Sequence, residues 1–192
     1  MTDKDEIRRR GLLARRSMDA DARASASAEI VRRVAASEVF RRARTVLIYA
    51  AMPDEVDLSG IEDCPEAAGK RICYPRILKE RQMEALIPCS GDSWRQGTFG
   101  IMEPDPGMSE KIDPHDIDLV ICPCTAFDAE GRRMGMGGGY YDRYLPGCRN
   151  AVIAAAAFEV QRVAHVPEES YDVRMQMVFT EKNSQLPATK KS

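Results

Sequence analysis

Four apolar runs constrain the fold of this chain more than any other feature. Each is long enough for one strand and has almost no polar interruption. Runs of this kind are typical of strands that are buried on both faces, as in parallel sheets covered by helices on each side. The four runs are TVLIYAAM (45–52), IDLVICPCTAFD (117–128, which opens as a strand and ends in a turn), AVIAAAAF (151–158) and MQMVFT (175–180).

Helical and shorter strand segments alternate with these runs. A basic amphipathic helix is expected over 3–17, and a second helix, capped by Asp19 or Asp21, through about Ala36. Further segments are a helical stretch near 57–68, strands at 71–78 and 82–88, a long Gly/Pro/Ser-rich loop at 89–107, and a helix beginning at 140–145. This alternation predicts a three-layer α/β/α fold with a largely parallel, Rossmann-like sheet, of the sugar-isomerase and CoA-transferase type. Residues 1–182 should form a single domain with basic N-terminal helices, and 183–192 a flexible C-terminal tail.

The charge of the chain is unevenly distributed. The 192 residues carry a net charge of −2, yet residues 1–44 hold 12 Lys/Arg against 7 Asp/Glu. Two interpretations stay open: the basic helices close over an anionic ligand, or they dock on an acidic body. Aromatic residues make up only 6% of the chain, and the overall charge is negative, so we expect no nucleic-acid partner.

The cysteines and the chain start indicate a reduced, cytoplasmic protein. Six cysteines are present, but no CxxC motif or Cys/His cluster accompanies them, which argues against disulfides and against zinc. The opening MTDKDEIRRR has no apolar core for export, and no apolar run approaches the roughly 18 residues of a membrane span. We therefore expect no membrane partner.

A glycine-rich loop is the strongest chemical feature. Five of the 13 glycines fall within 131–139, in the string EGRRMGMGGG, and YYDRYL follows as a helix start. Such glycines can take positive φ and leave room for a ligand, and backbone N–H groups with Arg132 and Arg133 can bind an anion. The loop is neither a Walker A nor a GxGxxG motif, so a tight structural turn remains the alternative. Asp142 is either a helix-start acid or a Mg²⁺ ligand.

The string GRRMGMGGGYYDRYL resembles the signature of the 5-formyltetrahydrofolate cyclo-ligase family. The resemblance extends along nearly the whole chain, because further segments fall in family order. These are Lys4-x-x-Ile7-Arg8, AAMPDEVD, ICYPRI, GTFGIMEP, IDLVICPCTAFD, AAAAFEVQ and SYDVRMQMVFTE.

The resemblance implies a role for individual residues. Arg133 and Tyr140 would be catalytic, and Asp142 and Asp172 would hold Mg²⁺. The folate substrate would contact Ala50, Glu55, Met136 and Tyr140. ATP would be bound by Lys4, Arg8, Arg133, Met134, Gly135, Met136, Gly137, Gly138, Gly139, Tyr140 and Tyr141.

The implied reaction is the ATP-dependent cyclisation of 5-formyltetrahydrofolate to 5,10-methenyltetrahydrofolate. We expect the protein to be a monomer. ATP would phosphorylate the formyl oxygen, and the resulting iminophosphate would lose phosphate when N10 attacks. Such catalysis needs alignment and charge neutralisation rather than a protein nucleophile.

Three positions depart from the family pattern, and three rival interpretations stay open. Cys124 stands where the family often has Gly, Tyr171 where it often has His, and Gln176 where a second Asp is common. The change at Gln176 motivates the first rival, a catalytically silent folate- or nucleotide-binding homologue. An RNA-binding module and a sugar-phosphate isomerase on a related scaffold are the others.

Overall fold

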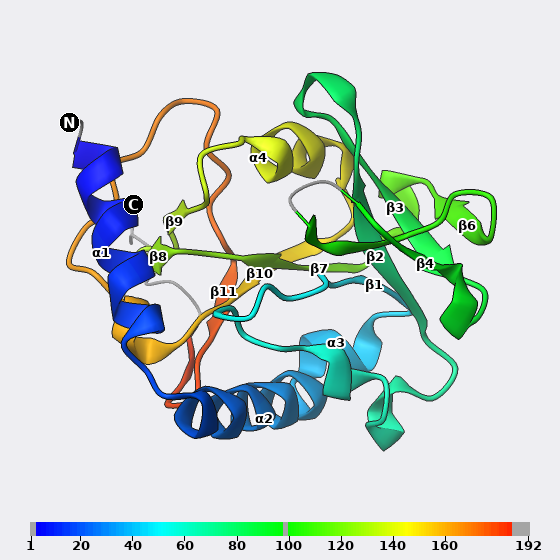
Figure 1. Cartoon of the computed structure of the whole chain (residues 1–192), viewed down its shortest axis with the longest axis horizontal. Helices are drawn as coiled ribbons and strands as arrows, with labels where there is room; N and C mark the ends of the chain where they lie inside the picture. The colour runs from blue at the N-terminus through cyan, green and yellow to red at the C-terminus, as the bar shows by residue number, and fades with distance from the viewer. Residues whose placement is uncertain (1–2, 98–99, 186–192) are drawn as a thin grey trace.

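The computed structural model describes residues 3–97 and 100–185, which form three layers around one large sheet (Figure 1). The sheet strands are β1 Thr45–Leu47, β2 Arg71–Ile77, β3 Met83–Pro88, β6 Ser109–Ile112, β7 Leu119–Pro123, β10 Val152–Ala156, β11 Met177–Phe179 and β12 Ser184–Gln185. Their order is β12-β11-β10-β7-β1-β2-β3-β6. The five strands from β11 to β2 run parallel, whereas β12, β3 and β6 pair antiparallel at the two edges. The expected three-layer fold with a largely parallel sheet is confirmed.

The remaining elements are short apart from two helices. The helices are α1 Asp3–Arg16, α2 Ala20–Ala36, α3 Glu38–Arg42 and α4 Tyr140–Tyr144. Two small hairpins pair β4 Trp94–Gln96 with β5 Met102–Pro104, and β8 Ala126–Phe127 with β9 Arg133–Met134. Single 3₁₀ turns lie at Ser59–Ile61, Pro65–Ala67, Lys79–Arg81, Gly91–Ser93, Pro114–Asp116, Leu145–Gly147 and Glu159–Gln161. No helix of the described residues is long and apolar enough to cross a membrane.

Two hydrophobic clusters fill the space on the two faces of the sheet. Alternate residues of one strand point to opposite faces, so Val46 joins the cluster under α2 and α3, and Leu47 joins the cluster under α4. Both side chains are fully buried, which explains why the strand runs are continuously apolar. Figure 1 shows α2 and α3 on one side of the sheet and α4 on the other.

Helix α1 stands apart from both clusters, at the edge of the molecule beside β8 and β9 (Figure 1). Its buried residues are Gly11 and Arg15, and neither belongs to the two large clusters. Ile7 packs on a small third cluster with Met134 and Val166. Helix α1 is therefore attached to the body largely through polar contacts.

Several local predictions were wrong. The stretch near 57–68 forms only 3₁₀ turns, because Gly60 and Pro65 interrupt it. The expected loop at 89–107 contains the β4–β5 hairpin, although residues 98–99 lie outside the described part of the chain. At the start of the expected tail, Ser184–Gln185 pair with β11, and residues 186–192 lie outside the described part, so the flexible tail at 183–192 stays a prediction. The domain boundary at residue 182 stays a prediction.

Candidate active site

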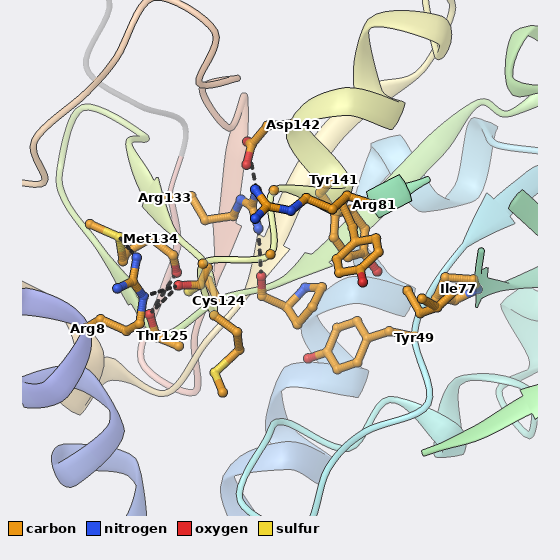
Figure 2. Close-up of a pocket in the computed structure, with 18 of the residues that line it drawn as sticks. Arg8, Tyr49, Ile77, Arg81, Cys124, Thr125, Arg133, Met134, Tyr141 and Asp142 are labelled. Atoms are coloured by element: carbon orange, nitrogen blue, oxygen red, sulfur yellow. Dashed lines mark hydrogen bonds and ion pairs between the residues drawn. The ribbon is translucent and has the colours of Figure 1, made fainter. Parts of the chain in front are cut away.

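One pocket of about 980 Å³ opens at the carboxyl ends of the parallel strands. Ligands of open α/β sheets bind at this edge, because the loops after the strands converge there. The loop after β1 supplies Tyr49, Ala50, Met52 and Glu55, and the end of β7 supplies Pro123, Cys124 and Thr125. The glycine loop, α1, the turn after β2 and the segment around Asp172 complete the wall. Figure 2 shows Arg8 on the side of the glycine loop, and Tyr49 and Ile77 on the opposite side.

Every site residue predicted from the resemblance lines this pocket. Residues from α1, the loop after β1, the glycine loop and the 169–172 segment are far apart in sequence, and the fold brings them together. They are Lys4, Arg8, Ala50, Glu55, Arg133, Met134, Gly135, Met136, Gly137, Gly138, Gly139, Tyr140, Tyr141, Asp142 and Asp172. Their individual roles are not decided by this placement.

Arg133 lies at the centre of the pocket. It stands in β9, and its side chain is 4% exposed. It donates from Nη2 to Asp142 Oδ1 at 3.0 Å and from Nη1 to the Pro123 carbonyl at 3.2 Å, as the dashed lines of Figure 2 show. Its Nε has no hydrogen-bond partner among the described residues, and neither has the buried hydroxyl of Tyr141. Unpartnered buried donors facing a pocket suit a polar ligand that accepts hydrogen bonds.

The glycine loop follows Arg133 and turns sharply into α4. Gly137 and Gly139 adopt positive φ of 94° and 67°, which favours glycine, whereas Gly135 and Gly138 do not. Helix α4 is only five residues long. An anion bound here would therefore be held by the loop backbone and the surrounding cations rather than by a long helix dipole.

Two cations of α1 close the pocket on the side of the glycine loop. Arg8 Nε donates to the Gly135 carbonyl at 3.0 Å. Lys4 Nζ lies 2.8 Å from Asp172 Oδ2 and 3.3 Å from Glu169 Oε2. Burial alone would lower the pKa of Lys4, but the hydrogen bonds to these two carboxylates outweigh it and raise that pKa. Lys4 is therefore charged at neutral pH. Helix α1 docks on acidic residues of the body, and Lys4 and Arg8 also line the pocket.

Glu55 is the buried acid on the other side of the pocket. Its side chain is 8% exposed, and Oε2 accepts a hydrogen bond from the Met52 N–H at 3.0 Å. Burial raises the pKa of Glu55, and the hydrogen bond from Met52 and the Arg15 guanidinium partly offset that rise. Arg15 was not predicted as a site residue.

The proposed metal ligands each have a cationic partner. Asp142 pairs with Arg133 and Asp172 with Lys4. Within residues 3–97 and 100–185, no group of three or more His, Cys, Asp or Glu side chains is arranged to hold a metal ion. Two carboxylates facing one pocket still match the preference of Mg²⁺, which takes one or two carboxylates and completes its shell with nucleotide oxygens and water.

The three departures from the family pattern are accommodated. Cys124 is buried and is not among the residues with positive φ, so its β-carbon causes no backbone strain. Burial raises the pKa of its thiol to about 12, which makes it a poor nucleophile. Tyr171 lines the pocket and is 66% exposed. Gln176 lies outside the pocket, at the amino end of β11, and accepts a hydrogen bond from the Ile153 N–H.

Sequence reasoning missed several residues of the pocket wall. Arg81, in the turn after β2, has a positive φ of 59°, and Glu103 in β5 is buried. Their segments were read as an ordinary strand end and a loop. The local sequence does not show that these two segments reach the pocket. Their positions depend on the antiparallel pairing of β3 with β2 and of β6 with β3, which joins residues far apart in the chain.

These features define an α/β protein with one large pocket at the carboxyl ends of its strands, lined by Lys and Arg side chains, a glycine-rich loop, apolar residues and the acids Glu55 and Glu103. A nucleotide-dependent enzyme is the class of protein that they describe. A family profile matches residues 1–181, and the chain belongs to the 5-formyltetrahydrofolate cyclo-ligase family. It is thus related to ATP-dependent ligases, as the resemblance implied.

Individual relatives agree with this assignment. The chain is 28% identical over 177 residues to the 5-formyltetrahydrofolate cyclo-ligase of Mus musculus, covering 86% of this chain and 87% of that protein. It is 27% identical over 137 residues to the Haemophilus influenzae cyclo-ligase, covering 69% and 73%. The structure of the Aquifex aeolicus 5,10-methenyltetrahydrofolate synthetase superposes with a TM-score of 0.85 at 28% identity, covering 100% of this chain and 96% of that one. The Mycoplasma pneumoniae synthetase, at 18% identity and a TM-score of 0.77, shares the fold.

Proposed function

We propose that this protein catalyses the ATP-dependent cyclisation of 5-formyltetrahydrofolate to 5,10-methenyltetrahydrofolate, releasing ADP and phosphate. One observation carries the proposal: a single pocket holds the α1 cations, the glycine loop and buried Glu55. The family membership supports the choice of substrates. The reaction needs two ligands bound side by side, a strongly anionic nucleotide and a folate with a flat, hydrogen-bonding ring system, and one pocket of about 980 Å³ has room for both reacting groups.

The chemistry follows from the poor leaving ability of a formamide oxygen. That oxygen attacks the γ-phosphorus of ATP, and the bond to the bridging oxygen breaks, so that ADP leaves. N10 then attacks the activated formyl carbon and loses its proton to solvent, the carbon–oxygen bond breaks, and the electron pair departs with phosphate. No protein nucleophile is required, which fits the buried Cys124 thiol with its pKa of about 12.

Each group of residues contributes to one part of this reaction. Lys4, Arg8 and Arg133 neutralise the triphosphate, and the glycine loop gives backbone N–H groups access to it. Tyr140 and Tyr141 lie at the junction of the two ligands, and Glu55 orients the folate near Ala50 and Met136. A bound Mg²⁺, held by Asp142 and Asp172, would supply charge neutralisation at the phosphates. We expect the enzyme to act as a cytoplasmic monomer.

The first test is turnover. Purified protein is mixed with 5-formyltetrahydrofolate, ATP and Mg²⁺, and the near-ultraviolet absorbance of the methenyl product is followed. Arg133→Gln and Asp142→Asn should each lower kcat/KM by about a hundredfold or more, as for removal of a charge-stabilising donor. Arg149→Gln, an exposed arginine outside the pocket, is the control and should behave as wild type.

A negative result would favour a different assignment. ATP binding by folded protein without any methenyl product would support the catalytically silent homologue. The position of Gln176 at the amino ends of the strands, away from the pocket, removes the sequence argument for that alternative.

A further inference from the structure

Four residues of α1 form one stripe that faces the body of the protein. Lys4, Arg8, Gly11 and Arg15 follow the i, i+4, i+7, i+11 spacing of one helix face. Lys4 and Arg8 reach the pocket beside the glycine loop. Gly11 lies against the Thr125 carbonyl, where a β-carbon would overlap the oxygen. Arg15 ends the stripe and is 1% exposed.

Arg15 connects α1 to the acid at the other end of the pocket. Its Nη1 lies 3.4 Å from Glu55 Oε1, and its Nη2 lies 3.1 Å from Asp54 Oδ1. The second oxygen of Glu55 accepts from the Met52 N–H at 3.0 Å. Both oxygens of the Glu55 carboxylate are therefore held, one by the backbone of its own loop and one by α1.

We propose that Arg15 is a positioning residue for the folate substrate: it fixes the orientation of the Glu55 carboxylate in the wall of the pocket. This inference rests on the proposed function, because it assigns Arg15 a part in the same reaction. Arg15 does not line the pocket, so it acts through Glu55. The geometry that carries the proposal is the bidentate reach of one buried guanidinium to two carboxylates.

The surroundings of Glu55 show why a cation is needed there. A carboxylate that is 8% exposed loses most of its hydration, and an ionised form persists only if charge or hydrogen bonds replace the water. Arg15 is the one cation whose ion pair with Glu55 is seen among the described residues. The other titratable or charged groups that act on Glu55 are Asp54, Tyr49, Cys124 and Tyr141. Ionised Asp54 disfavours the charge of Glu55, and the remaining three are neutral at pH 7.

The adjacent arginine provides a matched control. Arg16 Nε donates to Asp54 Oδ2 at 2.8 Å, but Arg16 makes no ion pair with Glu55 in the described structure and is 59% exposed. Arg15→Gln and Arg16→Gln therefore remove the same charge from neighbouring positions of one helix. They differ in that the first takes the cation from Glu55 at a buried position, whereas the second leaves that cation in place and changes an exposed position.

The experiment measures KM for each substrate in wild type, Arg15→Gln and Arg16→Gln. Arg15→Gln should raise KM for 5-formyltetrahydrofolate about tenfold, the size expected when a buried charged group loses its partner. KM for ATP should change less than about twofold, since Lys4 and Arg8 stay in place, and Arg16→Gln should stay within about twofold for both substrates. If Arg15 only fastened α1, both KM values would rise together, which would overturn the proposal.

A pH profile gives a second readout. Glu55 binds folate when ionised, and Arg15 lowers its pKa, so loss of Arg15 raises that pKa further. The acidic limb of kcat/KM for folate should then move to higher pH in Arg15→Gln and not in Arg16→Gln. An unmoved limb would contradict the proposal.

The conservative variant covers the case in which Arg15→Gln does not fold. Arg15→Lys keeps a cation but replaces the two guanidinium nitrogens, which reach Asp54 and Glu55 separately, with a single ammonium. Its KM for folate should therefore lie between those of wild type and Arg15→Gln, about threefold above wild type. A wild-type KM for folate in folded Arg15→Gln would overturn the inference, and where that variant does not fold, a wild-type KM for folate in folded Arg15→Lys would overturn it. If the wild-type protein itself gives no methenyl product, the proposed function has failed, and the two failures are thereby distinguished.

Discussion

At the scale of single residues, Asp128 shows how one buried carboxylate can organise a loop. It lies just after β8 and is 3% exposed, and its oxygens accept hydrogen bonds from the N–H groups of Glu130, Arg132 and Val166 and from the Arg132 side chain. Burial alone would raise the pKa of Asp128, but the bonds from Val166 and Arg132 outweigh it and lower that pKa.

We predict that Asp128→Asn lowers the free energy of unfolding at pH 7 by about 1–3 kcal/mol, because an amide is a weaker acceptor in this site. Because the pKa of Asp128 is lower in the folded than in the unfolded chain, its carboxylate contributes its full stabilisation of the folded state above the ordinary pKa of Asp. This contribution is lost as the pH falls through the lowered pKa. The difference in free energy of unfolding between wild type and Asp128→Asn should thus be constant from pH 7 to about 5 and shrink below about 4. Urea unfolding at several pH values measures it. Asp63→Asn, at an exposed position, should show no gap.

Single residues also show what the sequence could and could not reveal about the site. The glycine loop, Arg133 and Glu55 are recognisable because motif and strand position are local properties. Arg15 escaped notice, although its signal was present: with Lys4, Arg8 and Gly11 it completes a helical stripe in which no residue is a typical core residue. Glu103 and Arg81 had no comparable signal, since their place in the pocket depends on which strands pair.

At the scale of elements, long apolar strands were easier to predict than short irregular segments. The runs around β7 and β10 can be recognised as strands from the sequence alone, because burial on both faces makes nearly every position apolar. Strand β3 pairs antiparallel with β2, and its sequence does not distinguish this from parallel pairing. The short helix α3 was missed because five residues give too little periodicity.

The close approach of helix α1 to the body predicts the effect of a substitution at Gly11. By helix propensity alone, Gly11→Ala should stabilise the helix by about 1 kcal/mol. A β-carbon there would overlap the Thr125 carbonyl oxygen, which is fixed by a hydrogen bond from Gln161, so α1 must move outward. We expect Gly11→Ala to lower the free energy of unfolding by about 1–3 kcal/mol and to raise KM for ATP, because Lys4 and Arg8 move with the helix. Thermal unfolding and steady-state kinetics measure both effects.

Arg10→Ala, at an exposed position of the same helix, is the control for that substitution. Arg10 makes no hydrogen bond or ion pair with the body among the described residues, so Arg10→Ala should keep the free energy of unfolding and KM for ATP near the wild-type values. A stabilised Gly11→Ala variant with unchanged KM would show that α1 does not lie as closely on Thr125 as the structure has it.

At the scale of the whole molecule, the protein consists of a self-contained three-layer body and one helix that completes its active site. The two large hydrophobic clusters draw on α2, α3, the sheet and the segment around Leu145, and contain no residue of α1. The pocket, by contrast, needs Lys4 and Arg8 from α1, and Glu55 needs Arg15. Helix α1 thus contributes to the active site but not to the two large hydrophobic clusters, whereas the body contributes to both.

We predict that a chain starting at Met18 still unfolds cooperatively but has lost cyclo-ligase activity and ATP binding. The cap of α2 survives this truncation, because Asp19 accepts from the Ala22 N–H. Full-length protein with ATP at about a hundredfold above Kd should gain about 2.7 kcal/mol, which raises Tm by about 5–10 °C, whereas the truncated chain should show no such rise. Differential scanning fluorimetry with and without ATP measures the difference. An aggregated or unfolded product would show that α1 belongs to the folding core, and an ATP-dependent rise in the truncated chain would show that the glycine loop and Arg133 bind the nucleotide without the α1 cations.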